Sequence, residues 1–305
     1  MQRIQHISFL SFRADPSLDA SIRRLKAAGY QVTRKRKPGA TEYAIRVPPG
    51  ATAWQAEIDA LTSSFAIRAL DIEERIEYSD EDFLEAGLFS FYLKPGASVD
   101  IPPGPDHILG LADIADWDES AACGSCGAGI VQRSPMRIPA SAMSKKRMVA
   151  ETGLDVGGDL MISEQLRLAL LEQFSIELPL LEIEQTGRAE RREKWWQVLP
   201  TMTLPPDWLV WVNIKATECP ECKVIRWRRD NPGEHSGTYL RKGSFQPEAT
   251  DAAVWSPDWS DEIHRAEDGR LLSAPQKSIF LRGDVGRAFR SLGLKQINLI
   301  PFEWR

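Results

Sequence analysis

The chain has 305 residues and a net charge of −5, and 43% of its residues are hydrophobic and 27% charged. This length leaves room for two domains, and the composition excludes a collagen, a disordered tail and a small disulfide-rich protein. No stretch approaches 18 uncharged apolar residues, so we expect no membrane span. Polar residues interrupt the first six positions before an apolar secretory signal could form, which predicts a cytoplasmic protein with reduced cysteines.

The first hundred residues alternate between strand-like and helix-like patterns. Leu18, Ile22 and Leu25 have the spacing of one helix face, and Trp54, Ile58, Leu61 and Phe65 that of another. Strand-like stretches surround these helices at 4–12, 32–35, 43–47 and 67–76. The order β-α-β-β-α-β predicts a ferredoxin-like N-terminal domain. A capping box at 79–82 and a strand at 88–93 are expected to follow.

A stretch rich in proline and glycine, residues 94–105, predicts a domain boundary. We therefore expect a ferredoxin-like domain at 1–97 and a second domain at 98–305, and an α+β class for the whole chain. The second domain contains all four cysteines and nine of the ten tryptophans, and its segments are separated by loops. It is expected to be an irregular α+β domain.

A weak internal repeat runs through this second domain. Residues 160–183 read as strand, helix and strand, and a shift of 119 residues gives the same order at 279–302. Each unit lies downstream of one Cys-x-x-Cys pair. Chance similarity of two apolar patterns is the alternative interpretation.

The strongest chemical signal is the pair of motifs Cys123-Gly-Ser-Cys126 and Cys219-Pro-Glu-Cys222, which together use every cysteine. Each pair can present two thiolates from a tight turn, and four thiolates complete the tetrahedral shell of zinc. Such a site has no open position for water or substrate, so the sequence predicts one structural zinc ion per chain, held by Cys123, Cys126, Cys219 and Cys222. The pairs are far apart in sequence, and the metal would therefore connect two distant parts of the chain.

Two other interpretations of the cysteines remain open. One pair could be a redox dithiol, although Gly127-Ala128-Gly129 is a poor start for the helix that such chemistry requires. The thiols could also be buried and uncoordinated.

The cysteine pattern and the residues around it resemble the double-CXXCG family of bacterial proteins. The resemblance covers roughly residues 106–305 and rests on the two motifs, the unit at 160–183 and the ending at 278–304. Lys223 stands where the family has a glycine. Some members are described as immunity proteins, so the resemblance implies a cytoplasmic, zinc-containing protein that binds and neutralises a cognate toxin.

The sequence contains no recognisable catalytic motif. The four histidines His6, His107, His235 and His264 accompany no metalloprotease, phosphate-loop or nucleophile-elbow signature. His107 and His235 could replace a cysteine ligand, but a surface or capping role is the favoured interpretation. Gly157, Gly158, Gly283 and Gly286 are interpreted as turn or helix-start glycines. We therefore expect a protein that is not an enzyme.

Two charged segments suggest partners. Residues 71–85 hold eight acids and one base, typical of a solvated face or of a docking surface for a basic protein. Lys223, Arg226, Arg228 and Arg229 surround Trp227, a pattern that can bind nucleic acid. The alternative function is therefore a zinc-dependent nucleic-acid-binding or regulatory module, with nucleic acid as the less favoured partner.

Tryptophans suggest both core and surface roles. Trp208 and Trp211 lie in a strand-like segment and are predicted to be in the core. Trp195 and Trp196 follow a charged run and are predicted to lie in a loop that forms a contact surface.

Overall fold

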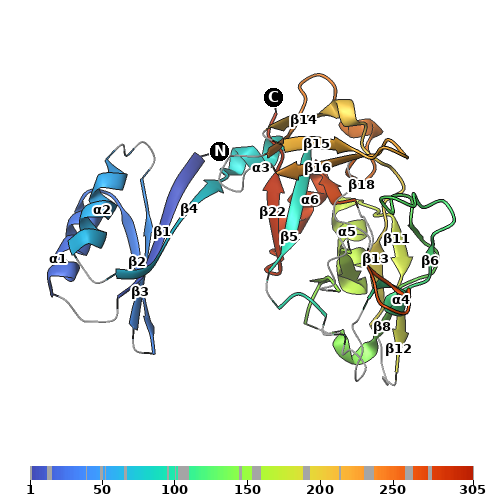
Figure 1. The fold of residues 1–305 in the computed structure, drawn as a ribbon, viewed down its shortest axis with the longest axis horizontal. Coiled ribbons are helices and arrows are strands. Elements are labelled where there is room, and N and C mark those ends of the chain that lie inside the picture. The colour runs from blue at the N-terminus through green and yellow to red at the C-terminus, as the bar shows by residue number, and fades with distance from the viewer. Residues whose placement is uncertain are drawn as a thin grey trace. The chain divides into compact units, whose positions relative to one another are not determined.

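In the computed structural model the chain forms two compact units, Met1–Asp82 and Phe83–Arg305 (Figure 1). Helices and strands are mixed in both units, as the α+β class predicts. The structure describes residues 2–11, 16–38, 40–48, 51, 53–64, 67–94, 96–99, 101, 110–143, 146–152, 159–187, 193–212, 214–229, 237–257, 264–273 and 277–304.

The first unit has the predicted order of elements. They are β1 (Gln2–Ser11), α1 (Pro16–Ala27), β2 (Gln31–Lys37), β3 (Ala40–Arg46), α2 (Trp54–Ser64) and β4 (Ile67–Glu77). The strands form one antiparallel sheet in the order β2-β3-β1-β4. Both helices cover the same face of this sheet, because their apolar stripes meet Phe9 and Ile45 in one buried cluster (Figure 1).

The division between the units lies earlier than the predicted boundary after residue 97. The capping box is present: Ser79 Oγ accepts from Asp82 N at 3.2 Å, and α3 (Asp80–Glu85) begins there. β5 (Leu88–Leu93) then pairs with β21 (Ile279–Arg282) and β22 (Ile297–Pro301). Val99 is also buried in the second unit. The described residues of the stretch rich in proline and glycine, 94, 96–99 and 101, therefore belong to the second unit.

Two four-stranded antiparallel sheets form the second unit, in the orders β11-β13-β10-β9 and β18-β21-β5-β22. The elements not yet bounded are β9 (Val149–Ala150), β10 (Met161–Ser163), α5 (Glu164–Phe174), β11 (Leu180–Glu182), β13 (Trp195–Val198), β18 (Ala253–Trp255) and α6 (Gly283–Ser291). The two strand-helix-strand units predicted from the sequence are confirmed as β10-α5-β11 and β21-α6-β22.

The internal repeat extends beyond these units, and its halves exchange a strand. In each sheet a middle strand separates the two strands of the unit: β13 in the first sheet and β5 in the second. β5 precedes the first cysteine pair and β13 precedes the second, so each half of the repeat supplies the middle strand of the other half's sheet. One buried cluster includes residues of both sheets and both helices.

Short elements complete the repeat. Each cysteine pair lies in an antiparallel hairpin, β6–β7 (Trp117–Asp118, Val131–Gln132) and β15–β16 (Ile214–Glu218, Ile225–Arg229). β8 (Arg137–Pro139) pairs in parallel with β12 (Glu184–Thr186), and Leu240 forms the matching parallel bridge to Trp304.

The remaining elements are α4 (Leu111–Ile114), the 3-10 turns 140–142, 206–208 and 247–249, β14 (Leu209–Val212), β17 (Gly237–Leu240), β19 (His264–Arg265) and β20 (Leu271–Ser273). Of the helices in the described ranges, none has the length and apolar character needed to cross a bilayer.

Candidate metal centre

The two cysteine pairs lie in turns of the same construction, which we call the first and second knuckles (residues 123–128 and 219–224). In the first, Gly127 N donates to Cys123 O at 2.7 Å and Cys123 N donates to Ala128 O at 2.8 Å. In the second, Lys223 N donates to Cys219 O at 3.0 Å and Cys219 N to Val224 O at 2.9 Å. The same two backbone hydrogen bonds therefore close each turn.

The residue after each second cysteine adopts left-handed backbone geometry. Gly127 has φ of 70° and Lys223 has φ of 62°. Glycine reaches this region without steric cost, whereas a residue with a Cβ does not. Lys223 thus adopts the same left-handed conformation as Gly127 at the matching position of the first knuckle.

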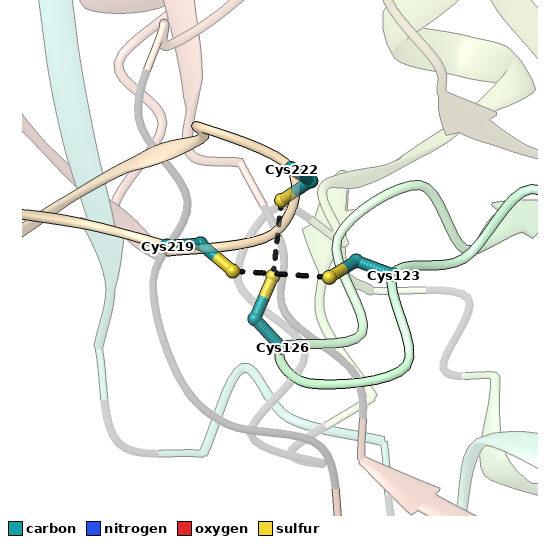
Figure 2. Close-up of side chains that lie close together, drawn as sticks. All are labelled: Cys123, Cys126, Cys219 and Cys222. Carbon is teal, nitrogen blue, oxygen red and sulfur yellow. Dashed lines mark hydrogen bonds between the residues drawn. The ribbon is translucent and has the colours of Figure 1, made fainter.

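The four sulfur atoms converge between the knuckles (Figure 2). Cys123 Sγ lies 3.8 Å from Cys219 Sγ, and Cys126 Sγ lies 3.5 Å from Cys222 Sγ. All four ligand atoms lie within 4.8 Å of one another. These distances exceed a disulfide bond of about 2.05 Å but allow all four sulfurs to contact one metal ion. The four residues predicted as metal ligands are therefore brought together.

Without a metal ion the pKa of the Cys219 thiol is shifted in the opposite direction from those of Cys123 and Cys126. Backbone N–H groups of Cys222 and Glu221 stabilise the Cys219 thiolate and lower its pKa to about 6. Removal from water raises the pKa of Cys123 to about 12 and also raises that of Cys126. A bound cation would favour the thiolate form of all four.

Glu221, inside the second pair, connects the two knuckles. Its carboxylate accepts from Ser125 N at 3.3 Å and lies 3.4 Å from Cys123 Sγ. These contacts lower the pKa of the Glu221 carboxyl. No sequence motif singles out Glu221, because only its position within the second pair hints that it faces the site.

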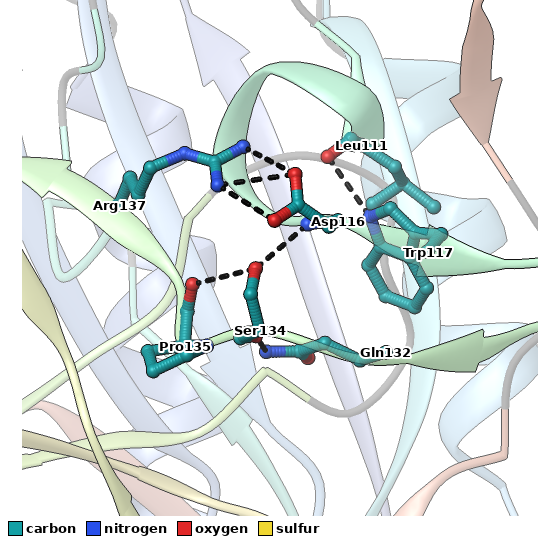
Figure 3. Close-up of polar contacts among 7 residues, drawn as sticks. All are labelled: Leu111, Asp116, Trp117, Gln132, Ser134, Pro135 and Arg137. Atoms are coloured by element: carbon teal, nitrogen blue, oxygen red, sulfur yellow. Dashed lines mark hydrogen bonds and ion pairs between the residues drawn. The ribbon is translucent and has the colours of Figure 1, made fainter.

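A polar network fixes the base of the first hairpin (Figure 3). Ser134 Oγ accepts from Asp116 N at 2.8 Å, and the Asp116 carboxylate lies 3.2 Å from the Arg137 guanidinium. Trp117 Nε1 donates to Leu111 O at 3.0 Å. The β6 side of the hairpin is therefore attached to α4 through Trp117 and to β8 through Asp116, and Ser134 ties its other side to Asp116.

The surroundings of the sulfurs favour a structural role over a redox role. Cys126, Ala128 and Cys219 are buried together, with Cys123 and Val224 packed against them. Each pair lies in a turn between strands, and not at a helix start where a redox dithiol gains its reactivity. Four ligands from the chain fill a tetrahedral shell, so a metal held here would have no open coordination position.

The prediction for Trp195 and Trp196 is wrong. Both belong to β13, where Trp195 is buried in the core and Trp196 is half-buried. The Arg167 guanidinium lies 5.2 Å from the Trp196 ring centre, and Trp196 Nε1 donates to Glu164. Both indoles thus have partners within the second unit.

The other tryptophans and the glycines have structural roles where they are described. Trp208 lies in the 3-10 turn 206–208 and not in a strand, and it is half-buried against a core cluster, so the core prediction is met only in part. The side chain of Trp211 lies outside the described residues. Gly283 and Gly286 lie in α6, which confirms a helical role for this pair. Gly157 and Gly158 lie outside the described residues.

The remaining candidates are tested only in part. His264 is exposed on β19, and the side chains of His6, His107 and His235 lie outside the described residues. In the acidic segment, Glu77 pairs with Arg46, while the side chains of 71–76 are not described. Strand β16 forms as predicted, but the side chains of Arg226, Trp227, Arg228 and Arg229 also lie outside that set. Nucleic-acid binding there stays a prediction.

Comparison with family models, with curated proteins and with solved structures finds no match for this chain.

Proposed function

We propose that this chain is a non-enzymatic binding protein whose second unit is held together by one structural zinc ion. The observation that carries this proposal is the convergence of four thiols from two knuckles 96 residues apart. Zinc bound at about 2.3 Å by four sulfurs in a tetrahedron keeps those sulfurs about 3.8 Å apart. The distances of 3.8 and 3.5 Å between facing sulfurs are close to this value.

The biological role that we propose is neutralisation of a cognate toxin by a bacterial immunity protein of the double-CXXCG type. It rests on the resemblance of residues 106–305, and the left-handed backbone of Lys223 supports it, since the residue that departs from the family pattern keeps the glycine conformation. We also assign the first unit to the ferredoxin-like arrangement, which is supported by its sheet order β2-β3-β1-β4.

The metal is tested by elemental analysis of protein purified without chelator. We expect one zinc per chain, and zinc near zero or a stoichiometric amount of iron would contradict the proposal. Cys222→Ser should lower the free energy of unfolding by several kcal/mol, because it removes a ligand. Ser125→Ala in the facing knuckle is the matched control, since the hydrogen bond of Ser125 to Glu221 uses its backbone N–H. Its melting temperature should stay unchanged.

The immunity role is tested in cells. A reading frame next to this one should encode a secreted toxin that arrests growth, and co-expression of this chain should restore growth. The purified pair should form a stable complex. Absence of a complex with that toxin, or rescue that does not require binding, would contradict neutralisation and leave the zinc proposal standing.

A further inference from the structure

The first unit carries a strongly basic edge. Residues 20–41 contain seven lysines and arginines and no acid, although the whole chain is acidic. Four of the bases, Arg34, Lys35, Arg36 and Lys37, follow one another on β2 and are exposed. β2 pairs with β3 on one side, and no strand of the described part of the chain pairs with its other side. These four side chains therefore line the edge of the sheet.

Helix α1 adds two bases to the same edge. The Arg34 guanidinium lies 3.8 Å from the Asp19 carboxylate, so the Asp19 side of α1 is beside β2. Arg23 and Lys26 follow Asp19 by four and seven residues and lie on the same helix face, where both are exposed. We define the basic edge as Arg23, Lys26, Arg34, Lys35, Arg36 and Lys37.

Arg24 belongs to a different surface. It lines a cleft between α1 and α2, together with Ala60 and Leu61. This difference makes Arg24 an internal control for the basic edge.

Little of this positive charge is neutralised. Within the described residues, Arg34 pairs with Asp19 and Lys37 lies 3.3 Å from Glu42, and no ion pair is found for the other four bases. Both pairs are solvent-exposed and therefore weak. Several acids lie on β4, the opposite edge of the same sheet, so the charge is separated across the unit.

The chemistry of this edge fits a nucleic acid better than an acidic protein. Protein interfaces centre on apolar or aromatic side chains, whereas protein–DNA interfaces are more polar and strongly positive. The large hydrophobic side chains that are exposed in the described chain all lie outside the basic edge. Alternate residues of a strand repeat about every 6.6 Å, comparable to successive phosphates of a nucleic-acid strand.

We propose that the basic edge binds the phosphate backbone of a nucleic acid. Because the edge offers no exposed aromatic ring for base stacking, we expect recognition of the backbone and not of sequence. This surface is independent of the metal centre and adds to the function proposed above.

Binding of the full chain to a short fluorescent DNA duplex, measured by anisotropy over a series of salt concentrations, tests the proposal. The variant Arg23→Gln with Arg36→Gln should weaken binding by roughly tenfold for each phosphate that is no longer bound, at about 0.1 M salt. It should also reduce the slope of log K against log salt by about 1 for each of these phosphates. The control, Arg24→Gln with Lys242→Gln, removes the same charge from exposed sites off the edge and should leave both quantities unchanged.

Four results would overturn the proposal: no binding of the duplex at low salt, equal reductions of affinity in the two variants, poly-glutamate bound as tightly as the duplex, or a reduction produced by Arg226→Ala but not by the basic-edge variant. Tight binding of poly-glutamate would indicate an acidic protein partner instead. A reduction by Arg226→Ala alone would place the site on β16. If the double variant fails to fold, Lys35→Gln, which alters one exposed strand residue, replaces it and should show the reduction expected for one phosphate.

Discussion

The residue after the second cysteine of each pair shows how strongly the knuckle dictates backbone geometry. Gly127 and Lys223 share the left-handed region and the same hydrogen bond to the first cysteine. For a residue with a Cβ that region costs about 1–2 kcal/mol. Lys223 forms an exposed ion pair with Glu218 at 3.3 Å, which offsets little of this conformational cost. Closure of the second knuckle therefore holds Lys223 in an unfavourable conformation.

Substitutions at these two positions should change the free energy of unfolding in opposite directions. Lys223→Gly should raise the free energy of unfolding by roughly 0.5–1 kcal/mol, because relief of the backbone cost exceeds the added entropy of the unfolded chain. Gly127→Ala should lower it by about 1–2 kcal/mol. Denaturant titrations at a fixed metal concentration measure both. Equal effects of the two variants would contradict this account of the turns.

Asp159 predicts a pH dependence of stability. This carboxyl is buried, and although Thr152 N donates to it at 2.6 Å, burial raises its pKa to about 7. In the unfolded chain its pKa is about 3.9. The folded protein therefore holds the proton longer, and its contribution to stability is complete below pH 4 and is lost as the pH rises towards 7.

The slope should be at most about 1.4 kcal/mol per pH unit from this group. Asp159→Asn keeps an acceptor for Thr152 and has no proton to lose, so unfolding free energies measured from pH 4 to pH 7 should become less dependent on pH. If the unfolding free energy of Asp159→Asn depended on pH as strongly as that of the parent protein, other groups would be responsible for this dependence.

For single residues, sequence patterns predicted the location correctly where it depends on neighbours in the sequence. They failed where the location depends on residues that are distant in the sequence. Two Cys-x-x-Cys pairs are sufficient to predict four clustered thiols. The charged run before Trp195 suggested a loop, but alternation along β13 buries Trp195 and leaves its neighbour at the surface of the core. No local pattern places Glu221 against the opposite knuckle, because Ser125 is distant in sequence.

Among the elements, α6 depends on glycine for its close approach to β5. A Cβ on Gly286 would lie 2.1 Å from the Phe89 ring, and one on Gly283 would lie 2.2 Å from Ala86 O. Phe89 is fully buried in the same cluster as the apolar face of α6. The helix therefore lies against the strand only because these two positions have no side chain.

Gly286→Ala should be destabilising although alanine is the better helix former. Overpacking against Phe89 costs roughly 1–3 kcal/mol, more than the gain of about 1 kcal/mol in helix propensity. Gly124→Ala is the control, since no atom lies within 4 Å of the added group. Thermal melts of both variants test this, and an increase in the melting temperature of the Gly286 variant would show that α6 can shift.

The order of helices and strands could be predicted from the sequence because it depends on local periodicity. Which strands pair with one another could not be predicted in this way. The strand at 88–93 was predicted with its observed bounds, yet it was placed in the wrong domain. Its partners β21 and β22 lie near the other end of the chain, and no pattern around residue 90 reports them. The domain boundary was therefore predicted after residue 97, whereas the two units divide after Asp82.

For the molecule as a whole, the exchanged strands make the second unit cooperative. Val198 of β13 is fully buried in the cluster that also contains Leu281 of β21. Val198→Ala should therefore increase amide exchange in the β18-β21-β5-β22 sheet as well as in its own. Ile45→Ala in the first unit should leave those amides unchanged. Hydrogen exchange read by mass spectrometry measures both, and an effect limited to the first sheet would show that the sheets open separately.

The exchange of middle strands between the two sheets also has a consequence for synthesis on the ribosome. When the first knuckle and β9, β10 and β11 have emerged, their sheet still lacks its middle strand β13. At that stage β5 also has no partner, because β21 and β22 are translated last. Only two thiols of the future cluster are available at that stage. The β18-β21-β5-β22 sheet therefore cannot close until β22, near the end of the chain, has been made, and the nascent first half exposes unpaired strand edges that a chaperone would have to shield.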